Sequence, residues 1–154
     1  MKEKTQEKER EAAIRETLDV FWRSVPPVWH ATRAITHTIA NDEFSITPSK
    51  FHALRRIVEG RQYVSQLADC MHISRPNISR LVDELVTDGL IERRPDAHDR
   101  RNVRLQMTEK GQTLYDAMHA RVHDQMAAFF SRLSNDELLE VQHGLSAMQK
   151  LVNQ

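Results

Sequence analysis

Residues 74–80 bring short polar and cationic side chains together at the start of a predicted helix. The apolar positions of this helix, Ile78, Leu81, Val82 and Leu85, recur at steps of three and four and form one buried face. Arginine bonds guanine and asparagine bonds adenine in the DNA major groove, although a solvated helix face is the plainer interpretation. The first turn and the opposite face present the candidate DNA-binding side chains: Ser74, Arg75, Asn77, Ser79 and Arg80.

A second cluster follows at residues 93–104, where five arginines accompany two aspartates. Predicted strands at 90–94 and 103–107 flank a polar turn at 95–102, so the cluster lies on a β-hairpin. An arginine at a hairpin tip can enter the narrow minor groove, and a neighbouring carboxylate can orient its guanidinium. The alternative is a charged turn that keeps an edge hairpin soluble, but the basic excess in a chain of zero formal net charge favours DNA contact. The candidates are Asp99, Arg100, Arg101 and Arg104.

Three short helices are expected to position these two clusters. Thr47 and Pro48 predict a helix start, and Gly60 predicts its end. A brief helix at 65–72 and the helix at 75–88, capped by Ser74 and stopped by Gly89, then form a helix-turn-helix pattern. Residues 62–64 are compatible with a very short strand ahead of them.

The amino-terminal segment predicts an amphipathic helix whose first and last residues the sequence does not define. Ile14, Leu18, Phe21 and Val25 recur at helical steps, whereas residues 1–16 are compatible with a solvated helix or a frayed terminus. Two prolines follow at 26–27 and interrupt the helical hydrogen bonding. The sequence is compatible with one kinked helix, or with two separate helices of which the second runs from Ser24 to about Asn41.

The carboxy-terminal segment predicts two further helices. Thr108 caps the first, and Ser134 with Glu137 forms a capping box for the second. The last helix carries a stripe with coiled-coil-like spacing, which favours a symmetric dimer over a helix that packs only on its own domain. The members of that stripe are Leu138, Val141, Leu145, Met148 and Val152.

The composition bounds the class of protein. The chain has 154 residues, of which 40% are hydrophobic and 29% charged. This length and hydrophobic content suffice for the core of one compact domain with helical arms. Four glycines and five prolines are too few for the turns of an all-β sandwich. The single cysteine excludes an internal disulfide framework and suits a reducing cytoplasm. Charged residues recur throughout, so no membrane span or secretory leader is expected.

These segments together resemble the MarR family of winged-helix transcriptional regulators over about residues 30–130. The resemblance is carried by ITPSKFHAL at 46–54, VSQLA at 64–68, SRPNISRLVDEL at 74–85, DGLIERR at 88–94 and DRRNVRLQMTEKG at 99–111. It implies that Asp99 and Arg101 form the wing signature, with Arg101 in the minor groove. His72 departs from the glycine frequent at this turn, so we expect it at positive φ.

The resemblance implies a mostly α fold with a small β-wing, that is, a winged helix-turn-helix with dimerisation helices at both chain ends. We expect an amino-terminal arm and core helix at 1–46, a DNA-binding lobe at 47–108 and dimerisation helices at 109–154, intertwined as one domain. The expected function is a cytoplasmic, ligand-responsive repressor that binds a pseudo-palindromic operator of double-stranded DNA as a homodimer. A dimeric scaffold without DNA binding is the alternative from another class.

The nature of an effector stays open. The resemblance implies that ligands act in a cleft between the dimerisation helices and the DNA-binding lobe, where cationic and aromatic groups would suit a phenolic or aromatic acid. The cleft candidates are Trp29, His30, Arg33 and Phe51, each of which also fits an ordinary core position.

Other chemistries have weaker support in the sequence. Metal sensing would use His119 and His123, one helical turn apart, with His30 and His37, and redox sensing would use Cys70. No cofactor is expected. Since the chain has no glycine-rich phosphate loop, nucleophile elbow or HisGluXXHis pair, an enzyme is not expected either.

Overall fold

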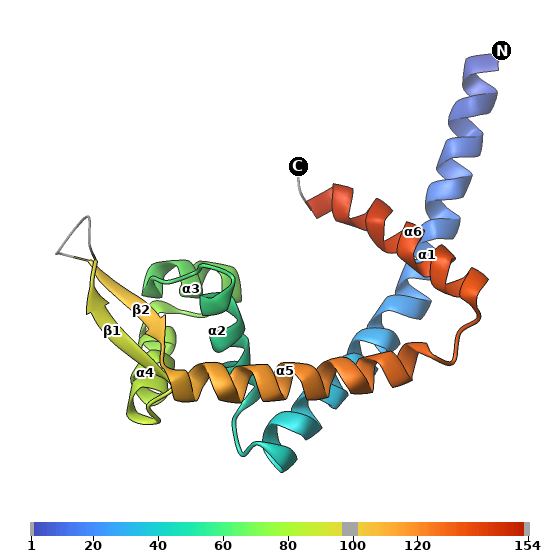
Figure 1. Cartoon of the computed structure of the whole chain (residues 1–154). Coiled ribbons are helices and arrows are strands. Elements are labelled where there is room, and N and C mark those ends of the chain that lie inside the picture. Colours follow the sequence, from blue (N-terminus) through green and yellow to red (C-terminus); the bar gives the residue numbers. More distant parts are fainter. Residues whose placement is uncertain (1, 97–101, 153–154) are drawn as a thin grey trace.

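Long helices carry the chain away from a small lobe of short helices and a hairpin (Figure 1). The computed structural model describes residues 2–96 and 102–152. In chain order the elements are α1 (Lys2–Thr38), the π-helical turn η1 (Ile39–Glu43), α2 (Pro48–Val58), α3 (Val64–Met71), α4 (Arg75–Thr87), β1 (Ile91–Pro95), β2 (Val103–Met107), α5 (Glu109–Phe130) and α6 (Asn135–Val152). The predicted mostly α fold with a small β-wing is confirmed.

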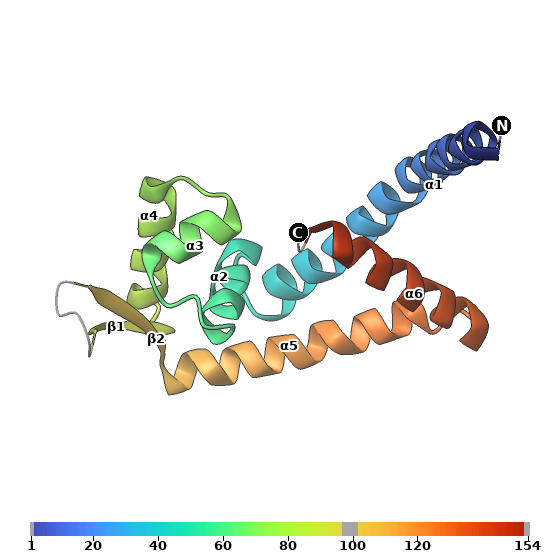
Figure 2. The same ribbon diagram turned by 90° about the horizontal axis from the view of Figure 1, so that it is seen from above.

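The core lies where α2, α3, α4 and the hairpin meet the first half of α5. Leu54, Leu67, Ile78 and Leu105 are fully buried there, together with Met118 of α5. From this core α5 runs towards α6 and the outer half of α1, as the view from above shows (Figure 2). The lobe is therefore rigidly attached to one long helix that leads to the far end of the molecule.

The helix starts follow the predicted caps. The Thr47 hydroxyl accepts a hydrogen bond from the Lys50 amide at 3.3 Å, and the Thr108 hydroxyl accepts one from Gly111 at 3.0 Å. The Glu137 carboxylate accepts from the Ser134 amide at 2.8 Å, which completes the predicted capping box. His72 has φ 53°, so the expected left-handed turn residue is also confirmed.

Of the two alternatives for the amino terminus, one kinked helix or two separate helices, the structure has the single helix. α1 is helical from Lys2 and continues through Pro26 and Pro27, so no second helix starts at Ser24. Each proline removes one backbone hydrogen bond, and the ribbon of α1 bends part way along its length (Figure 1). Beyond Thr38 the chain tightens into η1, whose Ile39 and Ala40 are buried against the lobe.

The expected short strand at 62–64 is wrong. The sheet of the described residues contains β1 and β2 alone, antiparallel with Ile91 opposite Met107 and Pro95 opposite Val103. The Gln62 carbonyl accepts one hydrogen bond from the Leu105 amide at 2.7 Å. Val64 already belongs to α3, so the segment turns away before it can pair further.

Apolar side chains stay exposed on the terminal helices of the isolated protomer. Trp22 of α1 is 68% exposed and Leu151 of α6 is 74% exposed, and α6 buries none of its described residues. A groove of about 970 Å³ runs between the two helices, lined by Leu18, Phe21, Trp22 and Val25 on one side and by Gly144, Ala147, Met148 and Leu151 on the other. Within the described ranges, the chain has no helix with the length and apolar character of a membrane span.

Candidate nucleic-acid interface

The amino-terminal half of α4 presents polar side chains to solvent. Ile78 and Val82 are fully buried, so the helix can turn only its other face outward. Arg75, Asn77 and Arg80 lie on that outward face and are exposed, whereas Ser79 is half-buried. The periodicity therefore separated buried from exposed positions correctly, except that Ser79 lies at the boundary.

Ser74 occupies the N-cap position of α4 without capping it through its side chain. Its backbone is extended, and its carbonyl accepts the first helical hydrogen bond from Ile78 at 3.0 Å. The hydroxyl makes no capping hydrogen bond, and Pro76 in the first turn has no N–H that would need one. Ser74 is therefore the N-cap residue, as predicted, but its hydroxyl does not form the predicted capping hydrogen bond. Pro76 has no N–H, so the first turn has one donor fewer to satisfy.

The hairpin continues the same exposed surface. Arg104 of β2 is exposed, and its Nε donates to the Gln62 side-chain oxygen at 2.5 Å. Arg93 of β1 forms an ion pair of 2.6 Å with Asp83 of α4. The expected wing residues Asp99, Arg100 and Arg101 lie outside the described residues. The strands that lead to them are thus tied to α4 and to the segment before α3.

The end of the hairpin remote from α4 and α5 is held by a contact that sequence analysis missed. Asp96 follows β1 there; it is only 7% exposed, and its carboxylate accepts a hydrogen bond from the Tyr63 hydroxyl. The Asp96 amide also donates to the Asn102 carbonyl at 3.0 Å. A buried carboxylate needs such partners, so Tyr63 ties the far end of the strands to the segment before α3. Tyr63 lies 33 residues before Asp96 in the sequence, so no local pattern predicts this hydrogen bond.

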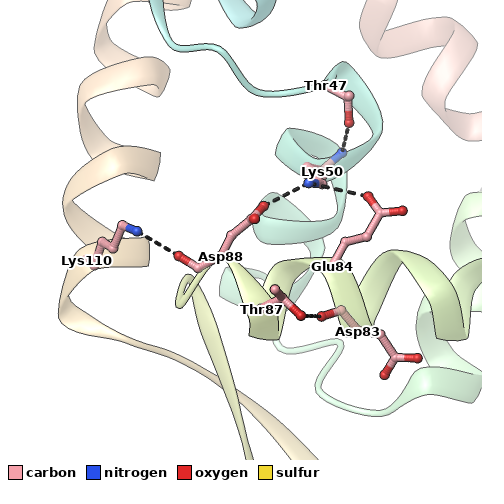
Figure 3. Close-up of polar contacts among 7 residues, drawn as sticks. All are labelled: Thr47, Lys50, Asp83, Glu84, Thr87, Asp88 and Lys110. Carbon is pink, nitrogen blue, oxygen red and sulfur yellow. Dashed lines mark hydrogen bonds and ion pairs between the residues drawn. The ribbon is translucent and has the colours of Figure 1, made fainter.

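The carboxy-terminal end of α4 carries a second missed group, shown in Figure 3. The Lys50 ammonium of α2 lies 2.7 Å from the Asp88 carboxylate and 3.3 Å from that of Glu84. The hydrogen bond to Asp88 outweighs partial desolvation and raises the pKa of Lys50 above its ordinary value. One signal in the sequence pointed to such a cation, because acidic residues at a helix C-terminus oppose the helix dipole and need a partner.

The structure brings two of the four expected ligand-cleft residues together. A depression of about 350 Å³ is lined by His30, Arg33, Ala34, His37 and Thr38. Trp29 is 61% exposed on α1, whereas Phe51 is 4% exposed in the core and stacks on Tyr115 at 5.8 Å between ring centroids. The assignment of these four residues to a ligand cleft stays a prediction.

Positive charge gathers beside this depression. The Arg33 Nε donates a hydrogen bond to the His37 Nε2 at 3.2 Å. The His52 side chain keeps an exposed edge, but desolvation of its ring, then the nearby Arg55, Arg56, His37 and Arg33, lower its pKa. An anion bound here would relieve that repulsion.

The residues considered for metal or redox chemistry are distributed over α1, α3 and α5. His119 and His123 are exposed on α5, and His30 and His37 lie on α1. No group of three or more histidine, cysteine, aspartate or glutamate side chains in the described residues is arranged to hold a metal ion. Cys70 is half-buried on α3 and donates to the Leu67 carbonyl at 3.6 Å.

Residues 44–102 match a family model described as the MarR family. The structure is similar to that of a MarR family protein from Bacillus stearothermophilus, with a TM-score of 0.74 and 22% identity over 94% of this chain and 98% of that one. It is also similar to a MepR mutant from S. aureus bound to an oligodeoxyribonucleotide, with a TM-score of 0.60 and 21% identity over 86% and 97% of the two chains. Wild-type apo MarR from E. coli has a TM-score of 0.65 and 23% identity over 79% of this chain and 94% of that one. At these identities the solved structures show a shared fold.

Proposed function

We propose that this chain is a member of the MarR family of winged-helix regulators and a sequence-specific repressor that binds double-stranded DNA as a homodimer. The observation that carries the proposal is the outward face of α4, where Arg75, Asn77 and Arg80 are exposed above a fully buried Ile78 and Val82. The proposed location is the cytoplasm.

The outward face of α4 supplies the groups for reading the major groove. Arg75 and Asn77 in the first turn would bond base edges, and Arg80 one turn further would bond a base or a phosphate. Ser74 and Ser79 are of the size that allows close approach of the helix to the DNA. The MepR mutant from S. aureus that shares the fold is bound to an oligodeoxyribonucleotide, which supports DNA binding by this chain.

The hairpin would contact the flanking minor groove. Arg104 is exposed on β2, and the Gln62 contact sets the direction of its guanidinium. Arg100 and Arg101, with Asp99 to orient Arg101, are the proposed minor-groove residues. In this arrangement α4 determines the sequence preference, and the hairpin contributes part of the affinity for DNA.

The second copy of the chain would cover the terminal helices. A single protein rarely leaves a groove of this size with Trp22 and Leu151 exposed, and burial of such side chains is the main source of association free energy. The proposed organisation has an arm and core helix at 1–46, a DNA-binding lobe at 47–108 and dimerisation helices at 109–154. Two lobes related by a twofold axis would require a pseudo-palindromic operator.

The proposed effector is a small aromatic or phenolic acid. Arg33 supplies the cationic group, His37 and His52 supply imidazoles that can hydrogen-bond a carboxylate, and the exposed Trp29 and His30 supply flat rings beside them. A ligand that binds one spacing of the two lobes better than another would release DNA by shifting the population between them.

A fluorescence-anisotropy titration tests the proposal. A labelled duplex from the chain's own upstream region is titrated with protein at near-physiological salt, with a shuffled duplex as competitor. Sub-micromolar binding that the shuffled duplex does not displace is the expected result. Equal competition by both duplexes would contradict specificity for that region, and the search would move to selection from a random pool. Absence of any binding, also in that selection, would favour the dimeric scaffold.

A further inference from the structure

The carboxy-terminal end of α4 is acidic, which is unfavourable for an isolated helix. Glu84 and Asp88 are one turn apart and repel each other, and the partial negative charge of the helix end repels both. The last turn of α4 has no basic residue of its own. A cation from another element must therefore hold this end in place.

Lys50 is that cation. Its side chain is 16% exposed, against 48% for Glu84 and 43% for Asp88, so it enters from the protein side and lies between the two carboxylates (Figure 3). The Thr47 cap fixes the first turn of α2, from which Lys50 extends. Partial burial strengthens the two ion pairs relative to exposed pairs.

The next turn of chain is fastened to α5. The Lys110 ammonium donates to the Asp88 carbonyl at 2.7 Å, and the Thr108 hydroxyl donates to the Gly89 carbonyl at 2.7 Å. The Thr108 amide donates to the Leu90 carbonyl at 3.1 Å. Three successive carbonyls after α4 are thus bound by the start of the helix that leads to the dimerisation end.

α4 transmits any change of angle from this end to its DNA-facing end. The helix has 13 residues, which corresponds to about 20 Å at the rise of an α-helix. A tilt of about 5° at the Asp88 end would displace the Arg75 end by nearly 2 Å, which exceeds the tolerance of a hydrogen bond to a base edge.

We propose that Lys50 is a positioning residue for operator binding, which fixes the angle of α4 through Glu84 and Asp88 without touching DNA. The inference rests on the proposed DNA-binding function. Lys50 is already engaged by two carboxylates at the end of α4 remote from Arg75, so it has no role as a phosphate contact.

The test compares the full-length chain with Lys50→Met, which keeps the length and removes the charge, and Lys50→Arg, which restores the charge. Lys8→Met, on the exposed outer part of α1, is the control for loss of one positive charge. Affinity for the selected operator is measured by anisotropy over a series of salt concentrations, and folding is checked by thermal unfolding. Should Lys50→Met unfold, Asp88→Asn and Glu84→Gln remove the same pairs from the other side.

Lys50→Met should lower the affinity roughly three- to thirtyfold at every salt concentration, the range for residues that couple without contact. The slope of log affinity against log salt should stay unchanged, Lys50→Arg should recover most of the affinity, and Lys8→Met should bind as the wild type does. Adding Asp88→Asn and Glu84→Gln to Lys50→Met should lower the operator affinity little further, because the carboxylate changes break the same ion pairs as the lysine change.

Three results would overturn the inference. The first is wild-type affinity in Lys50→Met. The second is a salt slope smaller by about 1.8, which means that each of two subunits lost a phosphate contact. The third is an equal loss in Lys8→Met, which means that bulk charge is responsible. If the wild type binds no duplex, the proposed function fails first and this inference fails with it.

Discussion

Gly111 lies against the backbone of Leu90 where α5 begins, and Gly111→Ala should destabilise the fold. A Cβ at this position would lie 1.9 Å from the Leu90 carbonyl oxygen and 2.8 Å from its carbon. Both atoms belong to the backbone, so no side-chain rotation can relieve the clash. The first turn of α5 would have to move away from the turn that follows α4.

The magnitude follows from the contacts that this movement breaks. Lys110 and Thr108 donate three hydrogen bonds to the carbonyls of residues 88–90, each worth about 1 kcal/mol net. Forced backbone movement in a packed core costs about 1–3 kcal/mol, whereas alanine gains about 1 kcal/mol over glycine in a helix interior. Since part of the hydrogen bonding survives a small shift, we expect Gly111→Ala to lower the free energy of unfolding by about 2–4 kcal/mol.

Chemical denaturation followed by circular dichroism measures this difference at a fixed protein concentration. Gly144→Ala is the matched control, because it is the same change inside a helix and its Cβ would meet nothing within 4 Å in the protomer. It should leave the free energy of unfolding unchanged or raise it by up to about 1 kcal/mol. Gly144 lines the α1–α6 groove, so sedimentation should confirm equal dimer content in both variants. A Gly111→Ala protein as stable as the wild type would refute the argument, since helix propensity would then outweigh the clash.

Three further predictions concern the DNA-facing surface, the terminal helices and His52. Arg75→Ala should cost about 1–3 kcal/mol of operator binding and relax the preference at one base position in a selection from randomised duplexes, whereas uniform weakening would assign it to a phosphate. Trp22→Glu places a charge in the exposed apolar groove and should raise the dimer dissociation constant more than about thirtyfold in sedimentation velocity, while an unchanged constant would remove Trp22 from the interface. The pKa of His52 is lowered below 6.5 in the folded protein, so stability should fall as the pH drops from about 6.5 through that lower value, where the unfolded chain takes up a proton first. His52→Gln should remove this part of the pH dependence, and an unaltered pH profile would show that other groups cause it.

Local sequence signals predicted the lobe well because its elements are set by short-range chemistry. The caps at Thr47, Thr108 and Ser134 depend on residues three positions apart, and the buried face of α4 depends on its own periodicity. The positive φ of His72 follows from its place in the turn of the helix-turn-helix. The predicted and observed bounds of β1 differ by one residue.

The failures lie where a distant segment decides the outcome. The strand expected at 62–64 did not form, because Val64 enters α3 after one hydrogen bond to β2. Phe51 fitted both a ligand cleft and a core position in the sequence, and the packing of α2 places it against Tyr115 in the core. The extent of α1 was open because two prolines weaken a helix without ending it when the flanking turns continue.

Periodicity and capping act within a few residues, so the order of the helices, the hairpin and the polar side chains that α4 presents outward could all be predicted from the chain. How that surface is held depends on contacts between residues far apart in the sequence. Lys50 lies 38 residues from Asp88, Tyr63 lies 33 residues from Asp96, and Lys110 lies 22 residues from the Asp88 carbonyl that it binds. Such pairs form because packing of the apolar core brings α2, α4, the hairpin and α5 to one place, and hydrophobic burial is non-directional, so the pattern along the chain does not specify which polar groups will meet.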